Sequence, residues 1–210
     1  VGVGLLVSPL VGFGSGALLT WLALNVSGEK ENPGSSNQRH PKIMRWLHIL
    51  SSSSVSFSHG SNDGQKTMGI ITLILSTHFA QYGFKHNEVP LFVMVGAALA
   101  IASGTMIGGW KVIRTVGTKI SRERLSHSQG FGASMSTAII ILIASAKGAP
   151  ISTTHTLSSA VAGGTIPVYG AGKLNAQTMW LIVLAWVLTL PVAALFAAIS
   201  YYILRFCWHG

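Results

Sequence analysis

Long apolar runs separated by short polar connections occupy most of this chain. Three runs are apolar throughout and cover residues 3–26, 89–113 and 177–206. Because a helix needs roughly 20 mostly apolar residues to cross a bilayer, each run predicts one transmembrane helix. Two other runs, 43–80 and 128–166, have the length of a span but are interrupted by glycines and polar side chains. If each of these also crosses once, the chain has about five membrane segments, two of them broken helices.

The composition also indicates a membrane protein. Hydrophobic residues make up 49% of the 210 residues and charged residues only 9%, whereas soluble domains carry about 25% charged residues. The 24 glycines are typical of membrane helices that pack closely or break. We therefore predict an all-α integral membrane protein of the cell (plasma or inner) membrane. Residues 1–210 would form a single membrane domain surrounded by lipid.

The basic residues predict the orientation of the helices. The net charge of +9 would suit nucleic acid, but the lysines and arginines gather in alternate loops, so no nucleic-acid partner is expected. By the positive-inside rule, residues 27–42 form a cytoplasmic connecting loop, the chain starts outside and its carboxyl terminus lies in the cytoplasm. The loops predicted inside hold Lys30, Arg39, Lys42, Arg45, Lys111, Arg114, Lys119, Arg122, Arg124 and Arg205, and those predicted outside hold Lys85 and Lys173.

An odd number of crossings predicts an inverted arrangement. A second copy joined in tandem would insert upside down, which is how many transporters build inverted repeats. The chain opens at Val1 rather than at a methionine, and with an outside start it is expected to be one half of an inverted-repeat transporter. Its partner would be a homologous N-terminal half or another copy of the chain.

The first interruption, "SHGSNDG" at residues 58–64, holds the only aspartate of the chain. Gly60 and Gly64 permit non-helical backbone, and serine, asparagine and aspartate compete with helical hydrogen bonds. We therefore expect the helix to break here and to resume near Gly64. A helix start is partly positive and offers free N–H donors, so it suits an anion.

The second interruption, "KGAPISTTH" at residues 147–155, follows the same logic. Gly148 and Pro150 would end one helix, and Ser152, Thr153 and Thr154 would begin the next, because hydroxyl residues favour the helix cap and proline the first turn. Three hydroxyls with free backbone amides suit a tetrahedral oxyanion. The hydroxyls could also serve only to cap the helix. The membrane setting and the presence of the first interruption favour oxyanion binding instead.

Asp63 is the strongest single indication of function. A carboxylate deep in a membrane costs several kcal/mol unless it is paired or hydrated. It could bind a coupling cation, carry a proton, accept a hydrogen bond from a protonated anion, or pair with Lys66 at helical spacing. His59 and His155, beside the two interruptions, could be structural or could change charge near neutral pH. Lys147 could supply positive charge or reach the membrane interface.

Two motifs resemble those of a known family. "FSHGSNDGQKTMG" at residues 57–69 resembles the second Asn-Asp motif of the inorganic phosphate transporter (PiT) family. "GAPISTTHTLSSAVAGG" resembles the Ser-Thr-Thr-His motif of the same family. The resemblance covers essentially the whole chain and is to the C-terminal half of bacterial low-affinity phosphate permeases. It departs from the common pattern at Gly64, Gln65 and Lys66, which leaves the coupling ion open.

The resemblance implies a symporter of inorganic phosphate, driven by Na⁺ or H⁺ and working by alternating access, in some members with a divalent metal carried as a metal–phosphate complex. No resident cofactor, metal site or catalysis is expected. An anion channel or non-transporting membrane subunit is the alternative, and a hydrolase using the Ser, His and Asp of "SHGSND" is a weaker one. The implied phosphate-binding residues are Ser61, Asn62, Asp63, Ser152, Thr153 and Thr154, of which Asn62 and Asp63 would also handle the coupling ion, and His59, Lys66, Lys147 and His155 are secondary candidates.

Overall fold

The computed structural model describes residues 2–27, 42–85, 88–149 and 151–209. These residues are almost entirely helical and contain no strand beyond one isolated bridge between Ser121 and Leu174, which confirms the all-α class. The chain divides into two compact units, Val1–Leu174 and Asn175–Gly210. The predicted connecting loop lies almost wholly outside the described residues.

The first unit holds five α-helices within its described residues, and the second unit is one long helix. Two short 3₁₀ turns, η2 (Ala80–Tyr82) and η3 (Ala171–Lys173), lie in connections of the first unit. The α-helices are α1 (Gly2–Ser27), α2 (Lys42–His78), α3 (Leu91–Thr118), α4 (His127–Ala146), α5 (Thr153–Tyr169) and α6 (Ala176–His209).

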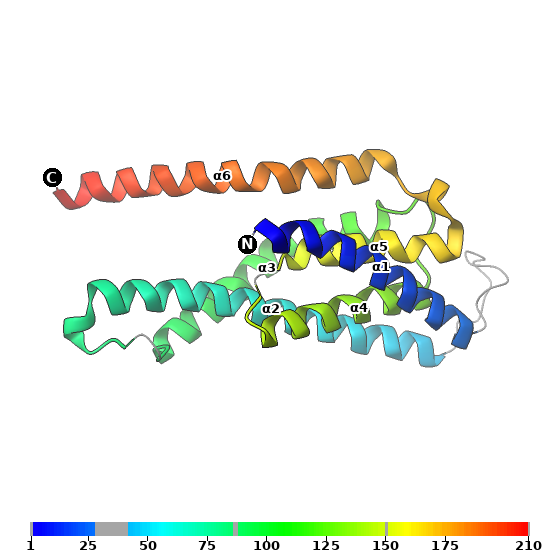
Figure 1. The fold of residues 1–210 in the computed structure, drawn as a ribbon, viewed down its shortest axis with the longest axis horizontal. Coiled ribbons are helices and arrows are strands. Elements are labelled where there is room, and N and C mark those ends of the chain that lie inside the picture. The colour runs from blue at the N-terminus through cyan, green and yellow to red at the C-terminus, as the bar shows by residue number, and fades with distance from the viewer. Residues whose placement is uncertain (1, 28–41, 86–87, 150, 210) are drawn as a thin grey trace. The chain divides into compact units, whose positions relative to one another are not determined.

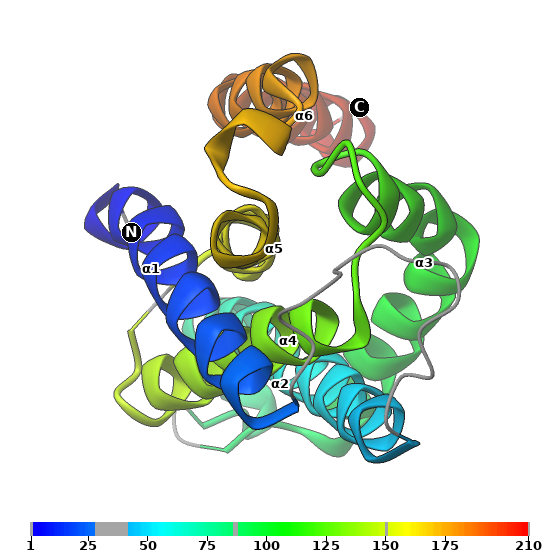
Figure 2. The same cartoon turned by 90° about the vertical axis from the view of Figure 1, so that its right-hand side faces the viewer.

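Helices α1 and α5 pack backbone to backbone and run in the same direction, as Figures 1 and 2 show. A Cβ atom on Gly12 would come within 2.5 Å of the carbonyl oxygen of Thr156, and one on Gly16 would overlap the backbone of Ala160. Gly163 of α5 lies equally close to the backbone of Phe13. Small residues spaced by four let two membrane helices approach closely, so the glycines of both helices account for this contact.

Helices α4 and α5 form a hairpin. Thr153 begins α5 near the middle of α2, with its hydroxyl 3.2 Å from Nε2 of His59. At its other end Tyr169 donates a 2.8 Å hydrogen bond to the carbonyl of Arg124, three residues before α4 begins. The helix pair therefore returns to the end from which it started (Figure 1). The expectation that residues 128–166 cross the membrane once is wrong, because α5 follows α1 back instead of continuing past α4.

The returning hairpin gathers several helix termini of the first unit at one end, which we call the basic end. Here α1 and α5 finish and α2 and α4 begin: Ser128 donates to Ser27 at 3.2 Å, and the Nδ1 atoms of His48 and His127 lie 3.4 Å apart. Lys173, expected on the opposite side from Glu123, forms a 2.7 Å ion pair with it at this end.

The basic end contradicts the predicted outside position of the connection after α5. Leu174 bridges to Ser121 there, so this connection lies at the same end as the loop before α4. Because residues 128–166 do not cross once, the predicted count of five crossings no longer supports an inverted second copy. The inverted repeat stays a prediction.

Helix α2 runs unbroken through the first predicted interruption, so the expected break at residues 58–64 is wrong. Its 37 residues extend over about 55 Å. Gly60 and Gly64 keep helical dihedrals, since the only positive-φ glycines of the described chain are Gly83, Gly148 and Gly170. Local hydrogen bonds explain why polar residues are tolerated: Ser58 Oγ donates to the carbonyl of Ser54 (2.7 Å) in the preceding turn.

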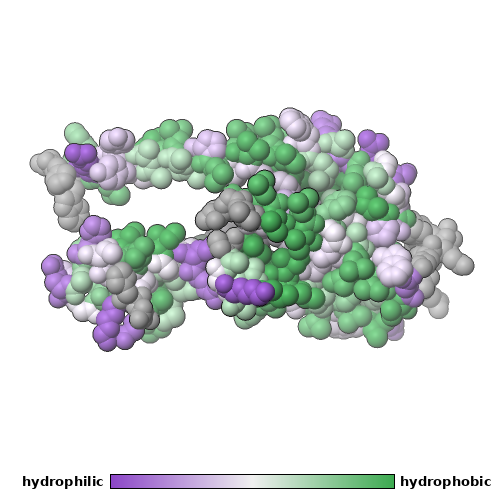
Figure 3. Space-filling view, in the orientation of Figure 1, coloured by the Kyte–Doolittle hydropathy of each residue, from purple (hydrophilic) through white to green (hydrophobic). Residues whose placement is uncertain are grey.

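Four helices of the described chain are long and apolar enough to cross a membrane, at Gly4–Ser27, Leu91–Thr118, His127–Ala146 and Ala176–Cys207. Large apolar side chains are exposed along them, and much of the face in Figure 3 is hydrophobic. This surface suits lipid. The protein is a multi-pass membrane protein, in which α4 has the length of a span but belongs to the hairpin.

Candidate functional site

Three charged or ionisable side chains of α2 meet in the middle of the helix. His59, Asp63 and Lys66 are separated by four and three residues, so they lie on the same face. Nε2 of His59 is 3.0 Å from Oδ2 of Asp63, and Nζ of Lys66 is 3.4 Å from Oδ1. Each side chain is 38–41% exposed. An ionised carboxylate only accepts hydrogen bonds, so with Asp63 ionised the shared proton would lie on Nε2 of His59.

The break between α4 and α5 lies opposite these charges. Gly148 adopts a left-handed backbone (φ 64°) just after α4, and its N–H donates to the carbonyl of Ser145 at 3.0 Å. A left-handed glycine commonly ends a helix because it has no Cβ to clash. Ser152 then caps α5 by accepting a 3.3 Å hydrogen bond from the N–H of His155. Both assignments match the sequence-based prediction, while Pro150 lies outside the described residues.

Three contacts join α2 to this break. We call the residues of these contacts, together with Asp63, the junction site. The hydroxyl of Thr153 lies 3.2 Å from Nε2 of His59. Lys66 donates to the carbonyl of Ile151 at 2.9 Å. Asn62 donates to Oγ of Ser145 at 2.8 Å. The junction site thus comprises His59, Asn62, Asp63, Lys66, Ser145, Ile151 and Thr153.

Two features leave the junction site ready to bind a polar ligand. Asn62 is 4% exposed, and its buried Oδ1 has no hydrogen-bond partner among the described residues. Buried polar atoms are nearly always paired, so an unpaired oxygen here indicates water or a ligand. In addition, the N–H groups of Thr153 and Thr154 open α5 and have no acceptor within the helix. The site therefore combines N–H donors, an ammonium group and a free amide oxygen.

The structure brings together only part of the predicted set. His59, Asn62, Asp63, Lys66 and Thr153 meet directly, and Ser152 caps the helix beside them. The other predicted residues do not belong to these contacts: Ser61 is half-buried on α2, Thr154 and Lys147 are exposed, and His155 is buried in α5 with its N–H held by Ser152.

Sequence reasoning missed two serines. Ser145 holds the side chain of Asn62, and Ser8 of α1 accepts a 3.3 Å hydrogen bond from the N–H of Ser152. Ser8 is 2% exposed. Neither lies in a motif, and only their distant partners identify them. Among the described residues, no group of three or more His, Cys, Asp or Glu side chains could hold a metal ion.

Comparison with known proteins shows the family to which the chain belongs. Residues 1–197 match the phosphate transporter family. The chain is 38% identical over 204 residues to a probable low-affinity inorganic phosphate transporter of Rhizobium meliloti (strain 1021), covering 94% of this chain and 56% of that protein. It is 36% identical over 203 residues to a probable low-affinity inorganic phosphate transporter of Bacillus subtilis (strain 168), covering 96% and 57%.

A third relative is more similar over a shorter stretch. The low-affinity inorganic phosphate transporter PitA of Escherichia coli (strain K12) is 44% identical over 114 residues, which is 54% of this chain and 22% of that protein. No solved structure matches the chain.

The matching family and the named relatives are phosphate transporters. The chain belongs to the phosphate transporter family. It spans about half the length of the curated relatives from Rhizobium and Bacillus that it matches.

Proposed function

We propose that this chain takes part in secondary active transport of inorganic phosphate, coupled to a cation, by alternating access. The observation that carries the proposal is the junction site, where the start of a helix meets the charged face of α2 within a membrane protein of this family. Alternating access rests on analogy with transporters whose central sites lie at broken helices.

The start of α5 is suited to hold the phosphate. Its first N–H groups and its partial positive charge favour an oxyanion. The exposed side chain of Thr154 can donate a further hydrogen bond, and Lys66 adds a full positive charge 2.9 Å from the carbonyl of Ile151. Phosphate would compete with that carbonyl for the ammonium group. Each hydrogen bond to a charged ligand contributes about 1.5–3 kcal/mol.

Asp63 is suited to couple transport to a cation. One of its oxygens lies 3.0 Å from Nε2 of His59 and the other 3.4 Å from Nζ of Lys66. Each oxygen keeps a second lone pair, so the carboxylate can take up a proton or give an oxygen to a sodium ion. Either coupling ion, H⁺ or Na⁺, fits this geometry. Transport of phosphate as a divalent-metal complex stays a prediction, tested by the Mg²⁺ dependence of uptake.

A second homologous half, or another copy of this chain, is proposed to complete the site. The side chains of His59, Asp63 and Lys66 are still more than one-third exposed. Ionisable groups at membrane depth are placed against protein or water rather than lipid. A partner surface carrying its own donors would close the site from the open side.

The test replaces Asp63 with asparagine and measures uptake of radiolabelled phosphate into vesicles under an imposed H⁺ or Na⁺ gradient. We expect Asp63→Asn to lower uptake about a hundredfold, the scale of breaking a partly buried ion pair. The matched control is Glu88→Gln, because Glu88 also pairs with a lysine three residues away, at 3.0 Å, but is 69% exposed.

Two results would contradict the proposal. Near-normal uptake by Asp63→Asn at equal membrane levels would remove the assigned role of the carboxylate. Uptake that neither saturates with phosphate nor responds to either gradient would indicate an anion channel instead.

A further inference from the structure

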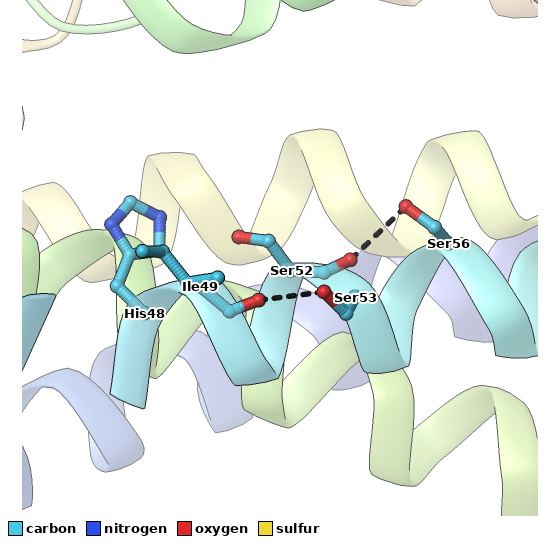
Figure 4. Close-up of a pocket in the computed structure, with 5 residues that line it drawn as sticks. All are labelled: His48, Ile49, Ser52, Ser53 and Ser56. Atoms are coloured by element: carbon cyan, nitrogen blue, oxygen red, sulfur yellow. Dashed lines mark hydrogen bonds between the residues drawn. The ribbon is translucent and has the colours of Figure 1, made fainter. Parts of the chain in front are cut away.

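One side of α2 carries a row of polar side chains that leads to the junction site. The spacings of three and four residues place the whole row within an arc of about 80° on the helix surface. Figure 4 shows its first three members following one another along one side of α2. We call it the α2 row, and it consists of His48, Ser52, Ser56, His59 and Asp63.

The first part of the row lines a hollow. A groove of about 300 Å³ is bordered by His48, Ile49, Ser52, Ser53 and Ser56 (Figure 4). That volume equals about ten water molecules at their liquid volume of about 30 Å³. Ser53 and Ser56 donate to carbonyls of their own helix, at 2.9 and 3.1 Å. Their oxygens keep lone pairs that can accept hydrogen bonds from water.

The row runs from the basic end to the centre of the molecule. His48 and Asp63 are 15 positions apart, which corresponds to about 22 Å along the helix. Half the thickness of a bilayer core is about 15 Å, so the row is long enough to reach from the membrane surface to mid-depth. Lys42 and Arg45, in the first turn of α2, place positive charge at its outer end.

Beyond the junction site the same face becomes apolar. Ile70 and Ile74 continue the row after Lys66 and are 62% and 49% exposed, and a polar side chain returns only at Thr77, next to the last residue of the helix. The polar lining therefore leads from the junction site toward the basic end and not toward the other end of α2. Water would wet one half of this face, and lipid or packed protein would cover the other.

We propose that the α2 row lines a water-filled passage through which inorganic phosphate moves between the junction site and the basic end. The proposal rests on the proposed phosphate transport and adds the route. A serine hydroxyl can turn its single proton from the helix carbonyl to a passing anion and can accept a hydrogen bond from water, so it can replace water around the anion without binding it tightly. The basic residues at the mouth attract the anion. A groove facing lipid would leave the remaining lone pairs of these hydroxyl oxygens without donors.

Cysteine accessibility tests the passage directly. In a Cys207→Ser background, Ser52→Cys and Ser56→Cys are exposed to a membrane-impermeant anionic thiol reagent from each side of the vesicle membrane. We expect fast modification from the side of the basic end, slowed by inorganic phosphate. The matched control is Ile74→Cys, which lies on the same face beyond Asp63 and should react slowly from that side.

A second pair of variants tests the route by placing a large side chain inside it or beyond it. Ser56→Phe should lower phosphate uptake about tenfold or more, whereas Ile74→Phe should leave it within about twofold of the parent, since only the first narrows the passage. If Ser56→Phe fails to insert, the smaller cysteine substitutions decide the matter.

The outcomes separate the route from the function. Unreactive cysteines at positions 52 and 56 in a protein that takes up phosphate normally would overturn the passage alone. Equal reactivity of Ile74→Cys would overturn its one-sidedness. Reactive cysteines that phosphate does not protect, in a protein without phosphate uptake, would support a hydrated groove and overturn the proposed function.

Discussion

Two stretches of this chain that contain helix-breaking residues have opposite backbones, and the second alone contains a proline, Pro150. Residues 58–64 and 147–152 both combine glycine with serine in a long apolar setting. The first stays helical within α2, while the second separates α4 from α5. Glycine alone therefore does not end a helix in this protein.

The difference lies in where the polar groups find partners. In α2, the carboxylate of Asp63 meets side chains one turn away on either side, at 3.0 and 3.4 Å, so the helix itself orders them. At the break, Gly148 takes a left-handed conformation and Ser152 turns its oxygen onto the next helix. The lesson is that spacing within the polar stretch, and capping geometry at its end, decide between a continuous and a broken helix.

Forcing a break into the continuous stretch should have the largest effect. Gly60→Pro removes an N–H of the helix and brings the ring against the carbonyl of Ser56, which costs about 3 kcal/mol or more. We expect a marked loss of thermal stability in detergent, measured by circular dichroism. Unchanged stability would show that α2 can break here after all, as its sequence first indicated.

Removing hydroxyls at the true break should have the next largest effect. Thr153→Val and Thr154→Val keep the branched shape and lose one hydroxyl each, so phosphate affinity should fall about tenfold to a hundredfold in at least one of them. Equilibrium binding of phosphate to the purified protein measures this. Thr165→Val is the matched control on α5, because its hydroxyl is buried and bonds the carbonyl of Val161 at 3.0 Å. Normal phosphate affinity in both test variants would show that these hydroxyls only cap the helix.

The smallest effect is expected when one glycine of each stretch is replaced with alanine. Neither Gly60 nor Gly148 has an atom within 4 Å of a hypothetical Cβ, so crowding does not distinguish them. Gly60→Ala should stabilise by about 0.5–1 kcal/mol in a helical position, and Gly148→Ala should destabilise by about 1–2 kcal/mol at positive φ. Opposite shifts in melting temperature are expected, and shifts of the same sign would contradict the contrast.

Local signals predicted the helices and the real break well. The apolar runs identified α1, α3 and α6, and Gly148 with Ser152 identified the end of one helix and the start of the next. The same reasoning failed at Gly60 and Gly64, because it gave the helix-breaking residues more weight than the Asp63–Lys66 pairing and did not identify the pair of His59 with Asp63.

The features that the sequence did not predict depend on contacts between residues far apart in the chain. Whether α5 continues across the membrane or turns back depends on its packing against α1, at Gly12 and Gly16. The partners Ser145 and Ser8 lie 83 and 144 positions from the residues they hold. No local pattern encodes a pairing at such separations, so Ser145 and Ser8 became visible only in three dimensions.

The close contact between α1 and α5 also limits how this molecule can move. Where two backbones touch without side chains between them, neither sliding nor swivelling is possible without collision, so these helices behave as a single rigid body. Gly64 of α2 differs, because a Cβ atom there would meet side-chain ends, that of Met68 at 3.6 Å and that of Ile101 of α3 at 3.8 Å. Side-chain tips can change rotamer, so such a contact can yield. The hinge of any shape change in this unit is therefore expected between α2 and α3. Helices α1 and α5 would move together as one rigid body.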